Sequence, residues 1–308
     1  MVSRGRFRGG AGLLVSGPMS LSADHARIAA LPCWRGVPHA ETLSGGMTNR
    51  NYLVRDDAGR HVVRLGSDMP HHMILRWHEL AAARAAQAAG LSPEIEHAEP
   101  GVLVMRFVDG RSLTAADIAD PARLPALADL LRRCHRDLPR HLAGPALAFW
   151  PFQVVRSYLA TLRAGPTPWR DRLAGFQALA DRLEDGLAPM PFVFAHNDLL
   201  PANLIDDGRR LWLIDWDYAG FGSPLFDLAN LASNAGLDAA VQDALLEAYF
   251  GAPPDAALRR DMAAMRAASL LRETLWGMVS ELHPAVDFDY AAYTRATLAR
   301  LEAELAAR

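Results

Sequence analysis

A pair of short apolar runs joined by a turn signal constrains this chain more than any other feature of its sequence. Residues 194–205 read FAHNDLLPANLI and residues 211–217 read LWLIDWD, with the turn sequence DDGR between them. This combination is typical of a β-hairpin. It predicts two short strands that bring Asp198, Asn203 and Asp215 close together.

Two carboxylates and an amide in this arrangement suit phosphoryl transfer to an alcohol. Asp198 can accept the proton of the acceptor hydroxyl, while Asn203 and Asp215 offer hard oxygen ligands for Mg2+. Side-chain alternation along the second strand places Asp215 on the same face as Leu213, where a metal would offset the cost of burying the carboxylate. The alternative is that both aspartates are ordinary turn or cap residues. The order of the three oxygen-bearing side chains favours the transfer site.

The composition sets the size of the fold and excludes several classes of protein. With 308 residues, 51% of them hydrophobic, the chain can fill the cores of a two-lobed globular enzyme. The basic residues are all arginine, and 32 of them against 35 acidic residues give a net charge of -3, which argues against a nucleic-acid partner. No apolar run is long enough for membrane insertion. Cys33 and Cys134 are too few for a disulfide framework, so a reducing cytoplasm is expected.

The order of the expected elements divides the chain into two lobes. Residues 1–20 are predicted to be a disordered extension, with Met19 as an alternative start. Residues 21–108 are predicted to form a smaller, nucleotide-binding lobe. Residues 109–308 are predicted to form a larger lobe for catalysis and substrate binding, with the turn at Asp109 as the hinge.

The two lobes are expected to differ in secondary structure. The smaller lobe is rich in β-structure, with strands expected over residues 41–54 and 61–65, a further apolar run over residues 101–108 and one helix over residues 73–89. The larger lobe is mostly helical, with helices expected over residues 121–137, 151–163, 169–187, 237–250, 256–282 and 290–307. The predicted fold class is therefore α+β.

Several segments, taken in order, carry a resemblance to a known family. They read LSGGMTNRNY at residues 43–52, VVRLG at 62–66, HND at 196–198 and IDWDY at 214–218, with Glu79 and Asn203 between them. In this order they resemble the choline/ethanolamine kinase family, part of the aminoglycoside-phosphotransferase-like small-molecule kinases with a protein-kinase-like fold. The resemblance runs from about residue 41 to residue 293. It implies ATP and Mg2+ as cofactors.

The resemblance implies that a loop of the smaller lobe contacts the phosphates of ATP. Gly45 and Gly46 allow the backbone to approach phosphate closely, and Thr48 and Asn49 add side-chain donors. An ordinary strand turn is the alternative for this segment taken alone.

Arg64 lies where kinase-like folds usually carry a phosphate-contacting lysine, and its planar fork can contact two phosphate oxygens. The resemblance implies that Glu79 holds Arg64 by an ion pair. It also places adenine near the backbone of Met105 and Phe107. The alternatives are a solvated surface arginine and a buried strand.

The resemblance also implies an acceptor site with aromatic side chains. A quaternary ammonium alcohol is best held by aromatic faces. Tyr218, Trp276 and Tyr293 match aromatic positions of the family, and Asp217 adds a carboxylate. A second tryptophan expected after Trp276 is replaced by Val279. Core packing is the alternative for each aromatic residue, because Trp276 belongs to a helical apolar pattern.

Other polar residues near these segments are less specific. Asn234 stands where the family has an acidic residue, and Asp227 matches a family aspartate that supports the catalytic loop. Carboxylates such as Glu273 can neutralise a cationic acceptor, or they can be exposed helix charges.

The expected function is ATP- and Mg2+-dependent phosphorylation of a small, cationic hydroxyl compound, with choline first and ethanolamine second. An aminoglycoside, thiamine or other small-alcohol kinase is an alternative, and so is a nucleotide-binding regulator without catalysis. A protein kinase is disfavoured, because Trp-Asp rather than Phe-Gly follows Asp215. The oligomeric state does not follow from the sequence.

Overall fold

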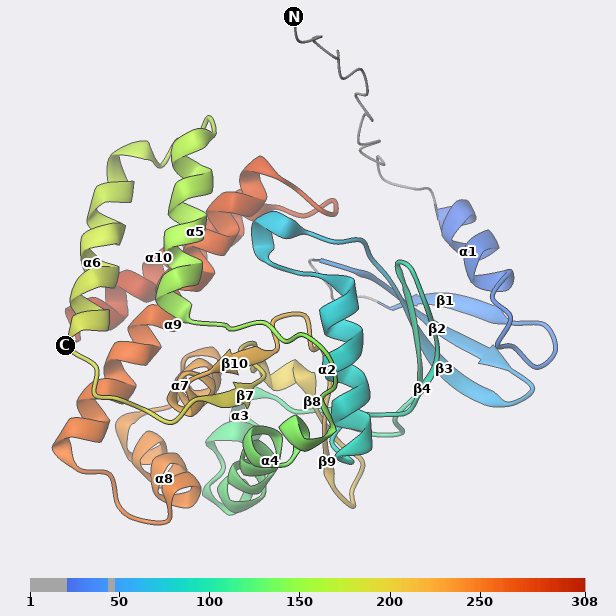
Figure 1. The fold of residues 1–308 in the computed structure, drawn as a ribbon, viewed down its shortest axis with the longest axis horizontal. Helices are drawn as coiled ribbons and strands as arrows, with labels where there is room; N and C mark the ends of the chain where they lie inside the picture. The colour runs from blue at the N-terminus through green and yellow to red at the C-terminus, as the bar shows by residue number, and fades with distance from the viewer. Residues whose placement is uncertain (1–20, 44–47, 308) are drawn as a thin grey trace, which may run out of the picture.

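The computed structural model describes residues 21–43 and 48–307, which form two lobes with helix α2 between them (Figure 1). The predictions for residues 1–20 and for Gly45 and Gly46 lie outside the described residues.

The smaller lobe is built on a five-stranded antiparallel sheet with the order β1-β2-β3-β5-β4. Helix α1 (Leu21–Ala29) precedes the sheet, and α2 (Arg76–Ala88) follows the turn η1 (Pro70–His72). The strands are β1 (His39–Leu43), β2 (Arg50–Asp56), β3 (Gly59–Leu65), β4 (Ile95–Glu99) and β5 (Val102–Arg106).

The single strand expected over residues 41–54 is wrong, because this run contains two strands. β1 and β2 pair in antiparallel fashion, with Leu43 opposite Asn51, so the chain reverses direction between them. Apolar and β-branched residues occur on both sides of this reversal, so the sequence pattern did not indicate where one strand ends and the next begins. β4 was not expected either, because its polar sequence IEHAE lacks the apolar alternation of a strand.

Helix α1 was also not expected from the sequence, and long-range polar contacts hold it against the sheet. The buried carboxylate of Asp24 accepts hydrogen bonds from Arg50 Nε at 2.5 Å and from the Tyr52 hydroxyl at 2.7 Å. Ile28 adds an apolar contact to the core of this lobe. A short helix is marginal in isolation, so these contacts account for its formation.

The larger lobe is mostly helical, as expected. Its helices are α3 (Ala115–Ala119), α4 (Leu124–Arg136), α5 (Pro151–Ala164), α6 (Leu173–Asp185), α7 (Pro224–Ala235), α8 (Ala239–Phe250), α9 (Ala256–Leu282) and α10 (Tyr290–Ala306). Helix α9 packs against α5, α6, α7 and α10, so it forms the centre of the lobe. Helix α7 was not expected from the sequence, and nearly all of its residues are buried.

Short strands carry the predicted hairpin and its surroundings. β7 (Val193–Ala195) pairs with β10 (Gly220–Gly222), and β8 (Leu204–Asp206) lies between β6 (Arg111–Ser112) and β9 (Leu211–Leu213). The hairpin is therefore present, but its second strand ends at Leu213. Asp215 has a φ of 71°, in the left-handed region, so the strand alternation predicted for its side chain does not apply.

The α+β fold class is confirmed by this combination of a five-stranded antiparallel sheet, two smaller sheets and many helices. The predicted lobe boundary at Asp109 falls in the segment between β5 and β6 and stays a prediction. None of the helices in the described part of the chain is long and apolar enough to cross a membrane.

Two helical glycines are expected to respond to alanine in opposite directions. A Cβ on Gly277 of α9 would come within 2.7 Å of Thr294 Oγ1 on α10, so Gly277→Ala is expected to lower the free energy of unfolding by about 1–3 kcal/mol. Gly175 on α6 has no atom of the described residues within 4 Å of that position, so Gly175→Ala is expected to raise it by about 0.5–1 kcal/mol. Urea denaturation measures both changes. Stabilisation by Gly277→Ala would contradict the close approach of α9 and α10.

Candidate functional site

Asp227 on α7 holds the loop that carries Asp198. Its carboxylate accepts hydrogen bonds from the backbone N–H groups of His196 at 2.9 Å and Asn197 at 2.7 Å. It also lies 2.8 Å from Nε2 of His135. Burial alone would raise the pKa of Asp227, but these hydrogen bonds keep it below its ordinary value. The supporting role expected for Asp227 is therefore confirmed.

Asn203 lies between Asp198 and the segment that carries Asp215. It ends the turn η5 (Pro201–Asn203), and its side-chain nitrogen donates to the Asp198 carbonyl oxygen at 3.0 Å. The carbonyl oxygen of Asn203 accepts from the N–H of Ile214 at 3.0 Å, directly before Asp215 in the sequence. The structure therefore brings together the three residues that the sequence singled out.

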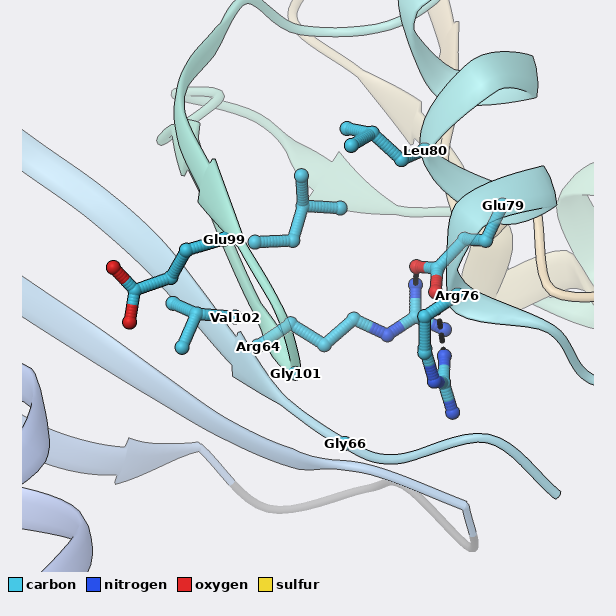
Figure 2. A pocket seen from close by; sticks show the side chains of 9 residues that line it. Arg64, Gly66, Arg76, Glu79, Leu80, Glu99, Gly101 and Val102 are labelled. Atoms are coloured by element: carbon cyan, nitrogen blue, oxygen red, sulfur yellow. Dashed lines mark hydrogen bonds and ion pairs between the residues drawn. The ribbon is translucent and has the colours of Figure 1, made fainter.

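Arg64 on β3 connects this group to the smaller lobe. Its guanidinium group lies 2.8 Å from Glu79 on α2, 2.5 Å from Asp215 and 2.6 Å from Asp217. Figure 2 shows Arg64 pointing from the sheet toward α2, where it meets Glu79. The expected ion pair between Arg64 and Glu79 is present, and two carboxylates of the larger lobe extend it.

Arg76 is a second guanidinium in this cluster, and sequence reasoning missed it. Its Nη1 lies 2.6 Å from Glu79, as Figure 2 shows, and 2.7 Å from Asp217. The spacing of three residues between Arg76 and Glu79 on one helix was the available signal. Asp217 also accepts hydrogen bonds from Asn49 at 3.1 Å and Thr48 at 3.3 Å. Asp217 therefore lies with the smaller-lobe residues.

The charges of this cluster are partly compensated. Burial raises the pKa of Glu79, and Arg64 and Arg76 oppose that rise. Burial alone would also raise the pKa of Asp217, but the two guanidinium groups hold it below its ordinary value. Arg64 and Arg76 face three carboxylates, including Asp215, so the ionised cluster has one net negative charge. A cation beside Asp215 would therefore be attracted.

The backbone groups near the expected adenine position are partly occupied. β3 and β5 pair with Met105 opposite Val62, and the Phe107 N–H donates to the Arg60 carbonyl oxygen at 3.0 Å. The Phe107 N–H is therefore not available to a nucleotide. Val108 comes directly after this ladder, where the chain runs toward the larger lobe.

The three expected aromatic residues lie together in the larger lobe. Trp276 Nε1 donates to the Tyr218 hydroxyl at 2.8 Å, and the ring centroids of Trp276 and Tyr293 are 5.6 Å apart. The Tyr293 hydroxyl donates to Glu273. Trp276 is only 4% exposed and its ring stacks on His72 at 5.0 Å. It is therefore a core residue that also contacts Tyr218 and Tyr293.

Arg272 is the most consequential residue that sequence reasoning missed. Its Nη2 lies 3.2 Å from Asp198 Oδ1, and its Nη1 lies 2.6 Å from Glu273. Burial raises the pKa of Asp198 to about 7 although Arg272 opposes this rise. A carboxylate with such a pKa is suited to exchange a proton near neutral pH.

A small cavity borders Arg64 and Glu79, and a larger groove lies at a different place; Asp198 lines neither of them. A cavity of about 40 Å³ between β3, α2 and the β4–β5 turn is lined by Arg64 and Glu79, and Figure 2 shows its side chains. It is too small for a nucleotide. A groove of about 550 Å³ lies between Phe107 and the β8–β9 turn, with Trp212 in its lining.

The described residues fit a magnesium ion bound together with phosphate. Mg2+ usually takes one or two protein oxygen ligands and completes its shell with phosphate and water. Asn203 uses its amide nitrogen for Asp198, which leaves its amide oxygen for a cation, and the Asp215 side chain is 35% exposed. Among the described residues, no cluster of three or more His, Cys, Asp or Glu side chains could hold a metal ion by itself.

Comparison with known proteins supports a phosphotransferase. The model of the phosphotransferase enzyme family matches residues 39–268. The chain belongs to this family. The matched region of the phosphotransferase family contains both Arg64 and the residues from Asp198 to Asp227, but it ends before Arg272.

Similar proteins carry choline and ethanolamine kinase names. Protein LicA of Haemophilus influenzae is 28% identical over 212 residues, which cover 67% of this chain and 61% of LicA. The crystal structure of a choline/ethanolamine kinase family protein from Mesorhizobium loti has a TM-score of 0.74 and 28% identity, covering 92% of this chain and 94% of the other. Choline kinase LicA from Streptococcus pneumoniae, with a TM-score of 0.71, 21% identity and coverage of 92% and 98%, shares the fold. The expected kinase-like fold is therefore confirmed.

Replacing Asp227 by asparagine is expected to destabilise the loop that carries Asp198. The Asn side chain has one acceptor oxygen, so at least one buried N–H of His196 or Asn197 loses its partner. We expect the free energy of unfolding to fall by about 3 kcal/mol. Asp243→Asn on α8 is the matched control, because Asp243 forms an exposed ion pair with Arg259, and we expect a change below about 0.5 kcal/mol. Equal denaturation midpoints for the two variants would contradict this role of Asp227.

Proposed function

We propose that this protein transfers the γ-phosphoryl group of ATP to the hydroxyl of a small cationic alcohol of the choline and ethanolamine kind. The observation that carries the proposal is the position of Asn203, which contacts both Asp198 and the segment of Asp215. This position supports a proton acceptor at Asp198 and two oxygen ligands for a cation at Asn203 and Asp215. The similarity to choline/ethanolamine kinases supports the same activity.

Asp198 is the proposed general base. As the acceptor oxygen forms its bond to the γ-phosphorus, the bond between this phosphorus and the β–γ bridging oxygen breaks and ADP leaves. The hydroxyl proton passes to the Asp198 carboxylate and from there to solvent. Arg272 and the loop supported by Asp227 orient this carboxylate.

Asn203 and Asp215 are the proposed protein ligands of Mg2+. When bound, the ion neutralises charge on the phosphate oxygens. Asp215 is oriented for this role by Arg64 and by its left-handed backbone conformation. A non-glycine residue in that conformation is typical of a functional site, because the surrounding structure must compensate its strain.

The nucleotide is proposed to lie against Arg64, the segment after β1 and the crossing between the lobes. Arg64 can give hydrogen bonds to phosphate oxygens as well as to carboxylates. Thr48 and Asn49 stay candidates for phosphate contacts, although their side chains contact Asp217 here. For adenine we propose backbone groups at Val108 in place of the Phe107 N–H, which is occupied.

A panel of alcohols tests the activity. Purified protein is incubated with ATP, Mg2+ and one acceptor at a time, and release of ADP is measured. Choline and ethanolamine are expected to stimulate ADP release, while an aminoglycoside and thiamine are expected to have little effect. A preference for the aminoglycoside or for thiamine would instead identify a different small-molecule kinase of the same fold. No stimulation by any acceptor would favour a nucleotide-binding regulator.

Asp198→Asn is expected to lower kcat strongly. The substitution keeps the shape of the side chain but removes the proton acceptor, and such losses are typically about 10²–10⁴-fold. The KM for ATP is expected to stay within about threefold, because Asp198 has no part in nucleotide binding. Steady-state kinetics with ADP detection gives both constants, and Asp243→Asn is the control. Undiminished kcat would remove Asp198 from its proposed role.

Asp215→Asn is expected to raise the Mg2+ concentration needed for half-maximal activity. The change replaces a charged ligand by a neutral one, which weakens binding of a hard divalent cation. Loss of one of the two charged or polar protein ligands is expected to lower the affinity for Mg2+ roughly tenfold or more. Activity is titrated against Mg2+ at fixed ATP for the variant and the unmodified protein. Superimposable titration curves would rule out Asp215 as a ligand.

A further inference from the structure

Arg272 places a buried cation against both Asp198 and Tyr218. It is among the largest fully buried side chains of the described residues, at 1% exposure, and it comes from the middle of α9. Its guanidinium group contacts Asp198 through both terminal nitrogens, at 3.2 and 3.3 Å, and Glu273 at 2.6 Å. The chain therefore places its own cation in contact with the proposed general base and with the neighbouring carboxylate of Glu273.

The same guanidinium covers an aromatic face. The Arg272 Cζ lies 4.4 Å from the ring centroid of Tyr218, which is the geometry of a cation–π contact. The neighbouring Trp276 has His72 stacked on its ring at 5.0 Å, with an interplanar angle of 29°. Tyr293 meets Trp276 edge-on, at 75°. Tyr218 and Trp276, two of the three rings that the sequence offered for a quaternary ammonium group, therefore each have one face already occupied.

The carboxylate of Glu273, beside Arg272, can still interact with a second cation. Asp198 and Glu273 carry two negative charges when ionised, and Arg272 compensates one of them. Glu273 is 14% exposed at its side chain and accepts a hydrogen bond from the Tyr293 hydroxyl. A group that donates hydrogen bonds can use the remaining lone pairs of this carboxylate. A trimethylammonium group has no N–H to donate.

We propose that Arg272 is a specificity-determining residue, which fills the cation position against Tyr218 and thereby selects acceptors with a hydrogen-bonding ammonium group over quaternary ones. This inference rests on the proposed function and concerns the acceptor side of the same site. It ranks ethanolamine above choline, whereas the sequence alone ranked choline first.

A series of acceptors with increasing N-methylation tests the inference. Ethanolamine, N-methylethanolamine, N,N-dimethylethanolamine and choline differ only in the number of donated hydrogen bonds and in the size of the ammonium group. For the unmodified protein, kcat/KM is expected to fall along the series, by at least about tenfold from ethanolamine to choline. An equal or higher kcat/KM for choline would overturn the inference without any variant.

Two substitutions at the same position separate charge from packing. Arg272→Gln keeps a hydrogen-bond donor toward Asp198 but removes the cation from Tyr218, so the ratio of the two kcat/KM values is expected to shift toward choline by at least about tenfold. Arg272→Lys keeps a cation, so its ratio is expected to stay within about threefold of the unmodified protein. Because each ratio is measured on one preparation, partial unfolding affects both of its terms equally.

Arg266→Gln is the matched control on the same helix. Arg266 is partly buried and pairs with Glu304 on α10 at 2.8 Å, away from Asp198. For Arg266→Gln, the ratio of kcat/KM for choline to kcat/KM for ethanolamine is expected to equal that of the unmodified protein. An unchanged ratio in Arg272→Gln, or the same shift in Arg266→Gln, would overturn the role of Arg272. Absence of acceptor-dependent ADP release with all four alcohols would instead refute the proposed function.

Discussion

The arrangement of this site depends on the ion pairs of the Arg64 guanidinium group, because they join side chains of both lobes. Glu79 belongs to the same lobe as Arg64, whereas Asp215 and Asp217 follow β9 in the larger lobe. A buried guanidinium is costly unless carboxylates compensate its charge. Glu79 is shared with Arg76, so it supplies only part of that compensation. The position of the aspartate segment relative to the sheet is therefore linked to the burial of Arg64.

Such a cluster is better explained by function than by stability. The loss of hydration offsets much of the attraction in a buried ion pair, so well-packed apolar residues often stabilise a fold as well or better. Asp215 adds a left-handed φ, which costs about 1–3 kcal/mol for a non-glycine residue. An unfavourable backbone conformation and a dense cluster of charges at one residue are together typical of a binding site. Neither feature is needed for a stable fold, since apolar residues and an ordinary backbone conformation can fill such a position.

The sequence predicted the parts of the site that depend on local order. The spacing of Asp198, Asn203 and Asp215 follows from a hairpin, and a hairpin is encoded by neighbouring residues. The pairing of Arg64 with Glu79 followed from the resemblance to a known family. The conformation of Asp215 was not predictable, because a strand alternation assumes extended backbone up to that residue. Helices α1 and α7 were missed for a related reason, since contacts with distant segments and extensive burial stabilise them.

The acceptor side shows why counting aromatic residues in a sequence overestimates a cation site. A ring contributes to binding a quaternary ammonium group only if one of its faces is free, and the occupant of that face is set by packing between distant segments. Tyr218 lies under Arg272 and Trp276 lies against His72, which come from α9 and from η1. An arginine within an apolar helical run is ordinarily expected at the surface, so its contact with Asp198 could not be inferred. On the proposed role of Arg272, charge compensation inside the chain, rather than the number of rings, would determine which cation this site accepts.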